Sequence, residues 1–245
     1  MPKAYPLGPP AGFPNCPSCL YKASGPATVC GRCVSEAVTP VAANGCPVCS
    51  QSVSGGACGN ALCRDRDRAI SRIAAIAVYD GELADRIKRY KYRKATGWSI
   101  IFGRLLLNWL ENNYYDPDDV DMITMIPSWA GPGGKRNWHH TELIIDQAAI
   151  ADTRHRWSFD ALDPRWITTA GPSPPSAGGG LPAKKAAAQE VAQLVRIHTD
   201  VEGQRIVLFD DICTTGYQLD AVAGRMLKAG AADVTGVVIG RSPWR

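Results

Sequence analysis

The most informative stretch of the sequence is Ile206-Val207-Leu208-Phe209-Asp210-Asp211-Ile212-Cys213-Thr214-Thr215-Gly216-Tyr217-Gln218. Its first four residues are apolar without alternation, which predicts a strand buried on both faces, as in a parallel sheet covered by helices. The two aspartates fall where this strand is expected to leave the sheet, and open α/β sheets bind ligands at the carboxyl ends of their strands. The stretch therefore predicts an α/β fold with a ligand site directly after this strand.

Small and hydroxylated residues follow the two acids. Thr214 and Thr215 offer hydroxyl donors, and Gly216 lets the backbone approach a ligand closely. A helix is expected next, because apolar residues recur at three- and four-residue steps until Gly230. The first amide groups of a helix have no partner inside the helix, so such a loop is typical of a phosphate site. Two carboxylates beside a phosphate loop fit a ribose 5-phosphate, which offers hydroxyls as well as a phosphate.

This stretch resembles the phosphoribosyl diphosphate (PRPP) motif of type I phosphoribosyltransferases, in which an apolar strand precedes two acids, two apolar residues and Thr-Thr-Gly. Cys213 stands where that family usually has an aliphatic residue, and Gln218 where it usually has Thr or Ser. The resemblance implies that Asp210 and Asp211 hold the ribose hydroxyls. It assigns the 5-phosphate to Thr214, Thr215, Gly216, Tyr217 and Gln218. The alternative, a magnesium-binding strand end of a P-loop nucleotide site, lacks support because the sequence has no G-x-x-x-x-G-K-[ST] segment.

Length and composition set broad limits. A chain of 245 residues has room for one α/β domain and a small added module, and its net charge of +4 does not demand a nucleic-acid or acidic-membrane partner. Residues 1–15 are rich in proline and lack the apolar core of a secretory signal, so we expect them to be disordered. Since no run of about 18 apolar residues occurs, we expect a soluble, cytoplasmic protein without membrane insertion.

The cysteines are concentrated near the N-terminus. Eight of the nine fall within residues 16–63, mostly as C-x-x-C pairs, which favours zinc over a disulfide framework. Eight thiolates make two structural zinc sites of four ligands, and the ion is expected to supply most of the folding free energy of so small a module. Pairing in sequence order gives Cys16, Cys19, Cys30 and Cys33, then Cys46, Cys49, Cys58 and Cys63. An interleaved pairing is equally compatible with the spacing. A redox role is disfavoured because none of the pairs opens a helix after a predicted strand.

The rest of the chain predicts an α/β pattern. Strands are expected at 73–79, 120–126 and 234–239, and helices at 82–94, 98–114, 138–151 and 184–196. The helix at 82–94 is strongly basic, which fits either a solvated face or attraction of a diphosphate or nucleic-acid backbone. Glycine-rich residues 127–136 form a loop of the kind that carries function. Residues 171–182 favour an active-site lid over a linker.

Three side chains suggest chemistry but have simpler interpretations. His139 and His140 are adjacent, and neighbours on a helix point about 100° apart, so we expect polar residues at a helix start rather than metal ligands. Cys213 is expected to pack under the loop, because the reaction implied by the motif needs no thiol.

The whole layout is similar to the ComF family, bacterial proteins that join a zinc-ribbon module to a phosphoribosyltransferase domain. The similarity spans about residues 16–241 and includes Tyr79-Asp80-Gly81, the Lys-Tyr helix around Lys91, and Pro127 with Arg136 nine residues later. The sequence after Arg136 departs from that family, as does the region of its lid. The resemblance implies a disordered N-terminus at 1–15, a double zinc-ribbon module at 16–63 and a phosphoribosyltransferase-like domain at 64–245.

Two functions follow from this resemblance. The first is transfer of a 5-phosphoribosyl group from PRPP to an acceptor that the sequence does not identify, with magnesium as cofactor and with backbone groups near Ser128 and Trp129 on the diphosphate. The second is a non-catalytic accessory that binds PRPP or single-stranded DNA, since the family is associated with DNA uptake in competence. A purely structural partner-binding protein would leave the Asp-Asp and Thr-Thr-Gly placement unexplained.

Overall fold

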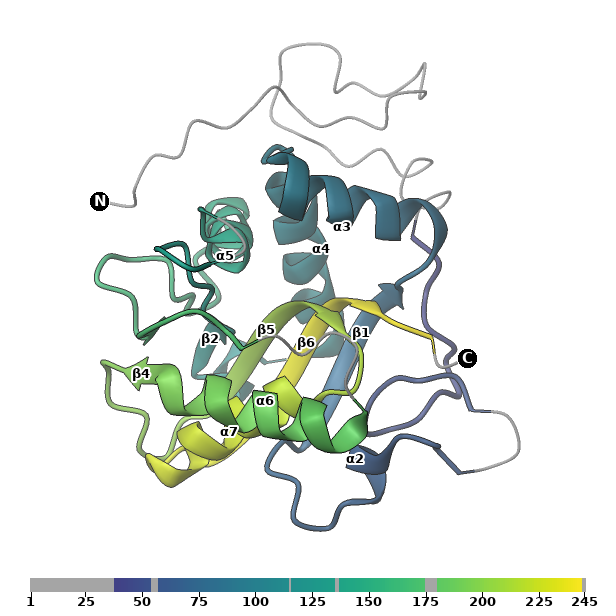
Figure 1. The fold of residues 1–245 in the computed structure, drawn as a ribbon. Coiled ribbons are helices and arrows are strands. Elements are labelled where there is room, and N and C mark those ends of the chain that lie inside the picture. Colours follow the sequence, from purple (N-terminus) through teal and green to yellow (C-terminus); the bar gives the residue numbers. More distant parts are fainter. Residues whose placement is uncertain (1–37, 54–56, 115, 135–136, 175–179, 244–245) are drawn as a thin grey trace.

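A computed structural model describes residues 38–53, 57–114, 116–134, 137–174 and 180–243. Its centre is a four-stranded sheet in the order β1-β6-β5-β2, with every neighbouring pair parallel (Figure 1). The strands are β1 (Arg72–Val78), β2 (Met122–Met125), β5 (Arg205–Cys213) and β6 (Asp233–Arg241). The predicted α/β class is therefore confirmed, with a parallel sheet flanked by helices.

Helices cover both faces of this sheet. On one face lie α4 (Trp98–Asn113) and α5 (His140–Ala151), and on the other lie α6 (Leu181–Leu194) and α7 (Tyr217–Lys228) (Figure 1). Strand β5 contributes to both cores, with Val207 and Phe209 in the α4–α5 core and Leu208 in the α6–α7 core. Apolar side chains on both faces are the reason that its sequence shows no alternation.

The central strand is longer than the sequence predicts. Its ladder with β6 continues past Phe209, pairing Asp210 with Val238 and Cys213 with Arg241. The expectation that the two aspartates follow the strand is thus wrong, because both lie within β5, near its carboxyl end. The reason is the partner strand, since β6 runs to Arg241 and keeps offering backbone hydrogen bonds.

Helix α3 (Gly81–Arg93) lies near the carboxyl ends of the strands (Figure 1). Asp80 caps its first turn by accepting a hydrogen bond from the Gly81 amide, and the expected apolar face of Leu83, Ile87 and Tyr90 is buried. Because this face is held in the α4–α5 core, the residues on its other sides are presented toward the sheet end and toward solvent.

Several short elements complete the described fold. They are α2 (Ala61–Arg64), the 3-10 turn η2 (Pro117–Asp119), and the antiparallel pair of β3 (Ile167–Thr169) with β4 (Val195–Ile197). The sequence predicts a helix through residue 196, but α6 ends at Leu194 because Val195 pairs with Thr169 in this small sheet. Among the described helices, none combines the length and apolar character that a membrane span requires.

Residues 38–53 pack against β1, the edge strand of the sheet. The amide of Ile73 donates to the Val48 carbonyl at 2.6 Å, and the amide of Val78 donates to the Thr39 carbonyl at 2.8 Å. Val38 reaches the α4–α5 core. The edge strand is therefore covered rather than open to other chains.

Candidate functional site

The anion loop, residues 214–218, follows the end of β5 and includes the start of α7. Gly216 sits at φ +88°, and a Cβ there would lie 2.7 Å from both Leu62 Cδ2 and Ile73 Cδ1, so the turn needs glycine for its conformation and its packing. Helix α7 begins at Tyr217 without a side-chain cap. The loop, including Thr214, Thr215, Gly216, Tyr217 and Gln218, lines a cavity of about 140 Å³. The Tyr217 amide donates to Thr215 Oγ1 at 3.5 Å, and backbone amides at a helix start beside a small cavity suit an anion.

A larger cavity of about 390 Å³ adjoins the first, and both have Asp210, Thr214 and Gln218 in their walls. Its other polar walls come from separate elements, namely Lys91, Ser128, Trp129, His140 and Asp211. The structure therefore brings every residue of the predicted PRPP site to the walls of two joined cavities at the carboxyl end of the sheet. Their dimensions and polar lining suit an extended ligand with phosphate at one end.

Asp211 is buried against two cationic or polar side chains that the sequence did not connect with it. Lys91 Nζ, on α3, lies 2.8 and 3.0 Å from its two carboxylate oxygens, and His140 Nε2, on α5, lies 3.6 Å from Oδ2. Only 14% of the Lys91 side chain and 3% of the Asp211 side chain are exposed. Lys91 is therefore directed into the site, so the basic helix is not wholly a solvated face.

The carboxyl of Asp210 is held in a setting that disfavours its charge. Burial, followed by the negative charge of Asp211, raises the pKa of Asp210 to about 8, although the nearby Lys91 acts in the opposite direction. A ligand that supplies hydroxyl donors or a cation would stabilise the charged form of such a carboxyl. Such perturbed groups in a cavity are typical of functional sites.

Replacing Asp210 with asparagine is expected to stabilise the ligand-free protein at alkaline pH. The pKa of this carboxyl rises from roughly 4 in an unfolded chain to about 8 in the folded one. Between these values the folded state retains a proton that the unfolded state has lost, so wild-type stability is fullest below about pH 4 and falls as the pH rises to about 8. Asparagine cannot ionise and should escape this loss.

Urea denaturation at about pH 5 and about pH 9 checks this expectation. The stability advantage of the variant should be larger at the higher pH, because only the wild type must ionise this carboxyl there. A variant whose stability depends on pH as the wild type does would show that Asp210 is ionised throughout this range.

The glycine-rich loop after β2 supplies the opposite wall. Ser128 is buried, and its hydroxyl has no hydrogen-bond partner among the described residues. The ring nitrogen of Trp129 donates a hydrogen bond to the Pro132 carbonyl, which holds the indole in place. His139 is the residue just before α5, and its Nδ1 lies 2.7 Å from the Ser128 carbonyl, so the two histidines stand at a helix start as expected. Arg136 lies outside the described residues.

Cys213 packs beneath the anion loop, in agreement with the sequence expectation. It is 2% exposed, and burial raises the pKa of its thiol to about 12. A thiol this protonated and enclosed is a packing group rather than a nucleophile.

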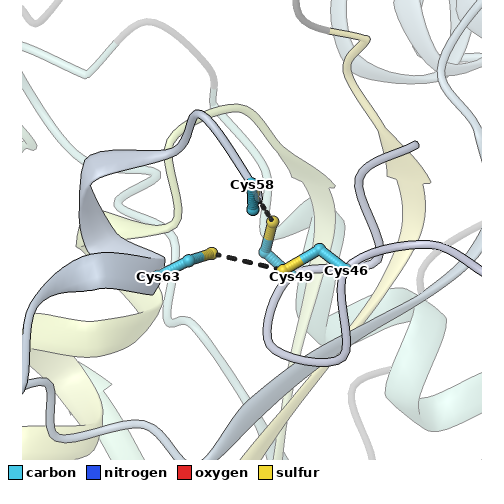
Figure 2. A group of neighbouring side chains, drawn as sticks. All are labelled: Cys46, Cys49, Cys58 and Cys63. Atoms are coloured by element: carbon cyan, nitrogen blue, oxygen red, sulfur yellow. Dashed lines mark hydrogen bonds between the residues drawn. The ribbon is translucent and has the colours of Figure 1, made fainter. Parts of the chain in front are cut away.

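Four cysteines from the N-terminal segment converge on one point, and we name Cys46, Cys49, Cys58 and Cys63 the four-cysteine cluster. Their sulfurs all lie within 4.8 Å of one another, and the side chains point toward a common centre (Figure 2). Two of the sulfur pairs are 3.7 Å apart. The structure thus assembles the second of the two sets given by pairing in sequence order. Cys16, Cys19, Cys30 and Cys33 lie outside the described residues.

This geometry fits a tetrahedral metal rather than disulfides. Sulfurs about 2.3 Å from a zinc ion at tetrahedral angles lie about 3.8 Å from one another, whereas a disulfide needs about 2.05 Å. Burial opposes ionisation of Cys49, but hydrogen bonds from Arg241 and the Gln51 backbone and the charge of Arg241 outweigh it and lower the pKa of that thiol to about 7, whereas burial raises the pKa of the Cys58 and Cys63 thiols. A thiolate is the form that binds metal, so the four cysteines could bind a zinc ion.

A third cavity, of about 550 Å³, lies on the exposed side of α3. It is lined by Tyr79, Asp85, Lys88, Arg89, Tyr92 and Arg93. Tyr92 is 65% exposed and also borders the larger cavity of the candidate site. Basic side chains around an exposed aromatic ring are typical of a surface for single-stranded nucleic acid.

Comparison with known proteins gives a distant similarity over nearly the whole chain. No family model matches. The chain is 23% identical over 209 residues to the DNA utilization protein YhgH of Salmonella typhimurium and, at the same identity, to that of Salmonella typhi, which covers 84% of this chain and 86% of each relative. The protein is thus similar, over 84% of its chain, to proteins named for DNA utilization.

Proposed function

We propose that this protein binds PRPP with magnesium and transfers or handles its 5-phosphoribosyl group, as the resemblance to the ComF family implies. The observation that carries this proposal is the pair of joined cavities, which place two acids, an anion loop and the loop after β2 around one space. A ribose ring with a phosphate on C5 and a diphosphate on C1 needs these three kinds of partner at three separate points.

Each end of the ligand has its own protein groups. The hydroxyls and amides of the anion loop bind the 5-phosphate in the smaller cavity. Asp210 and Asp211 accept hydrogen bonds from the 2- and 3-hydroxyls, which supply the donors that the crowded carboxylates need. Ser128, whose buried hydroxyl has no described partner, offers a donor to the diphosphate from the opposite wall.

In the transfer, the bond from ribose C1 to diphosphate oxygen breaks and the acceptor forms a bond to C1. Positive charge builds on the sugar ring as the bond breaks, and the aspartates beside the ring stabilise that charge. The diphosphate leaves with the bonding electron pair, and an acceptor that carries a proton loses it to solvent or to a base. Bound magnesium supplies charge neutralisation for the diphosphate.

Release of diphosphate from PRPP tests the catalytic part of this proposal. The wild type should release diphosphate with magnesium when a panel of nucleobases and other nitrogen or oxygen nucleophiles contains the acceptor. An Asp210→Asn variant should release less diphosphate, since it removes one of the two proposed carboxylates without breaking an ion pair. Binding of PRPP without release for any acceptor would favour the accessory function and not the enzyme.

The cavity on α3 favours a second function, binding of single-stranded DNA. Lys88, Arg89 and Arg93 can contact phosphates while Tyr92 stacks on a base. The relatives' name, DNA utilization protein, agrees with this chemistry. Since Tyr92 borders both cavities, DNA on this face would pass beside the phosphoribosyl site.

Replacing Tyr92 with alanine is expected to weaken binding of single-stranded DNA by roughly five- to a hundredfold, because stacking of one base contributes about 1–3 kcal/mol. Tyr92→Phe should bind as the wild type does, since it keeps the aromatic ring. Fluorescence anisotropy with a labelled oligonucleotide at several salt concentrations measures both. If the alanine and phenylalanine variants bind the oligonucleotide with equal affinity, no base stacks on Tyr92 in this cavity.

A further inference from the structure

The four-cysteine cluster lies directly behind the anion loop, and two buried polar side chains join them. We propose that Arg241 and Asn60 are positioning residues that fasten the anion loop to the metal site, so that the loop has its anion-binding shape only while the cluster holds its ion. The part that concerns phosphate affinity rests on the proposed function. The part that concerns loop shape does not.

Arg241 is the first of these links. It is 2% exposed and is the last residue of β6. Its Nε donates to the Cys49 carbonyl at 2.9 Å and its Nη2 lies 3.6 Å from the Cys49 sulfur, while its Nη1 donates to the carbonyls of Cys213, at 2.9 Å, and of Thr214. One planar guanidinium thus holds a metal ligand on one side and the loop on the other, which the single point donor of a lysine cannot do.

Asn60 is the second link. It lies between Cys58 and Cys63 in the sequence and is 1% exposed. Its Nδ2 donates to the Thr215 carbonyl at 3.0 Å, and its Oδ1 accepts from the Leu62 amide at 3.2 Å, which caps α2. The same side chain therefore orders the turn between two metal ligands and holds the next peptide of the loop.

These bonds fix the loop's donors through the peptide planes. The carbonyl of one residue and the amide of the next lie in one rigid trans peptide, pointing in opposite directions. Carbonyls of residues 213, 214 and 215 that are held toward Arg241 and Asn60 therefore set the amides of Thr214, Thr215 and Gly216 on the other side. Those amides belong to the residues that line the smaller cavity.

Packing makes the arrangement depend on the ion. Leu62 and Ile73 close against Gly216, and Leu62 belongs to α2, a helix of four residues. A helix this short has no stability of its own. Its position is set by Cys58 before it and Cys63 within it, so loss of the ion would release Leu62, Asn60 and the Cys49 partner of Arg241 together.

Hydrogen exchange of the full chain tests loop shape without any ligand. Three amides donate hydrogen bonds to the loop or to Cys213 directly before it, those of Tyr217, Asp220 and Ser242, and these loop amides report its shape. In the zinc-loaded wild type they should be protected, and removal of zinc with a chelator should speed their exchange by roughly tenfold or more while amides of α5, on the other face, change little. Loop amides that stay protected after zinc removal, or an equal rise in α5, would overturn the proposal.

Asn60→Asp separates positioning from general folding. It keeps the oxygen that caps α2 but loses the donor to the Thr215 carbonyl, so loop exchange should quicken in protein that still holds its zinc. The matched control is Asn108→Asp, the same change on the exposed side of α4, which should leave the loop unaffected. If the loop amides of zinc-loaded Asn60→Asp exchange as slowly as those of the wild type, Asn60 does not position the loop.

Linkage supplies a third arm, with ribose 5-phosphate as the probe. Zinc affinity, measured by competition with a chelator, should tighten about fivefold or more when ribose 5-phosphate is saturating, and zinc should tighten ribose 5-phosphate by the same factor. Arg241→Lys should lose this coupling, and Asn60→Asp covers the case in which that variant fails to fold. Equal zinc affinity with and without bound ribose 5-phosphate contradicts the coupling. A wild type that binds no ribose 5-phosphate would contradict the proposed function. The two hydrogen-exchange experiments would still test whether zinc and Asn60 set the shape of the loop.

Discussion

Replacing Cys49 with alanine is expected to remove about one zinc ion per chain and to disorganise the segment that covers β1. Structural zinc binds with an apparent free energy on the order of 10 kcal/mol, and most of that becomes folding free energy of the surrounding chain. The segment has little else to hold it, since among the described residues 38–53 and 57–64 the buried apolar ones are Val38, Cys46, Cys49 and Leu62. Elemental analysis and thermal unfolding measure the two effects.

Cys213→Ala is the matched control, because Cys213 is equally buried yet lies outside the cluster. It should keep the wild-type zinc content, which the two predicted sites put at about two ions per chain. Two results would count decisively against a metal at this cluster: wild-type protein that contains no zinc after purification under reducing conditions, or equal zinc content in Cys49→Ala and wild type.

Asp211→Asn is expected to lower the free energy of unfolding by about 3–5 kcal/mol, because it leaves the Lys91 ammonium buried without its counter-charge. The pair is close and largely shielded from water, with 2.8 Å between Lys91 Nζ and Asp211 Oδ2. The double variant Asp211→Asn with Lys91→Met should recover most of the loss, since it removes both charges. Urea denaturation of the wild type, Asp211→Asn, Lys91→Met and the double variant gives the coupling between the two residues.

Asp85→Asn provides the comparison for this pair. Asp85 and Lys88 are 3.6 Å apart on the same helix, but both side chains are more than half exposed. Breaking such a surface pair should cost less than about 1 kcal/mol. Similar losses for Asp85→Asn and Asp211→Asn would show that burial does not strengthen the pair at the site.

The local part of the site could be predicted from sequence because its signal lies within thirteen consecutive residues. The apolar run of β5, the acids, the loop and the helix α7 each have a pattern of their own. The strand's true end at Cys213 could not be predicted, because it depends on how far β6 extends beside it. The sheet of β3 and β4 was missed for a similar reason, since three-residue strands have no readable period.

The tertiary part of the site could not be predicted from local patterns. Lys91 lies 120 residues before Asp211 and was one of several cations on a basic helix. His140 was assigned to a helix start, which is correct, but only the packing of α5 beside β5 turns it toward Asp211. A readable signal did exist for Lys91: it lies four residues after Ile87, which is buried, and residues four apart lie on the same side of a helix.

Calorimetric titration with PRPP and magnesium, repeated with ribose 5-phosphate, tests the central claim most directly. The wild type should bind both ligands at one site, and Thr215→Val should weaken both by the same factor, roughly ten- to a hundredfold, because each presents its 5-phosphate to the anion loop. Thr215→Ser should bind nearly as the wild type, since it keeps the hydroxyl. A folded wild type that binds neither ligand, or a Thr215→Val variant that binds both unchanged, would contradict a phosphoribosyl site at the end of β5.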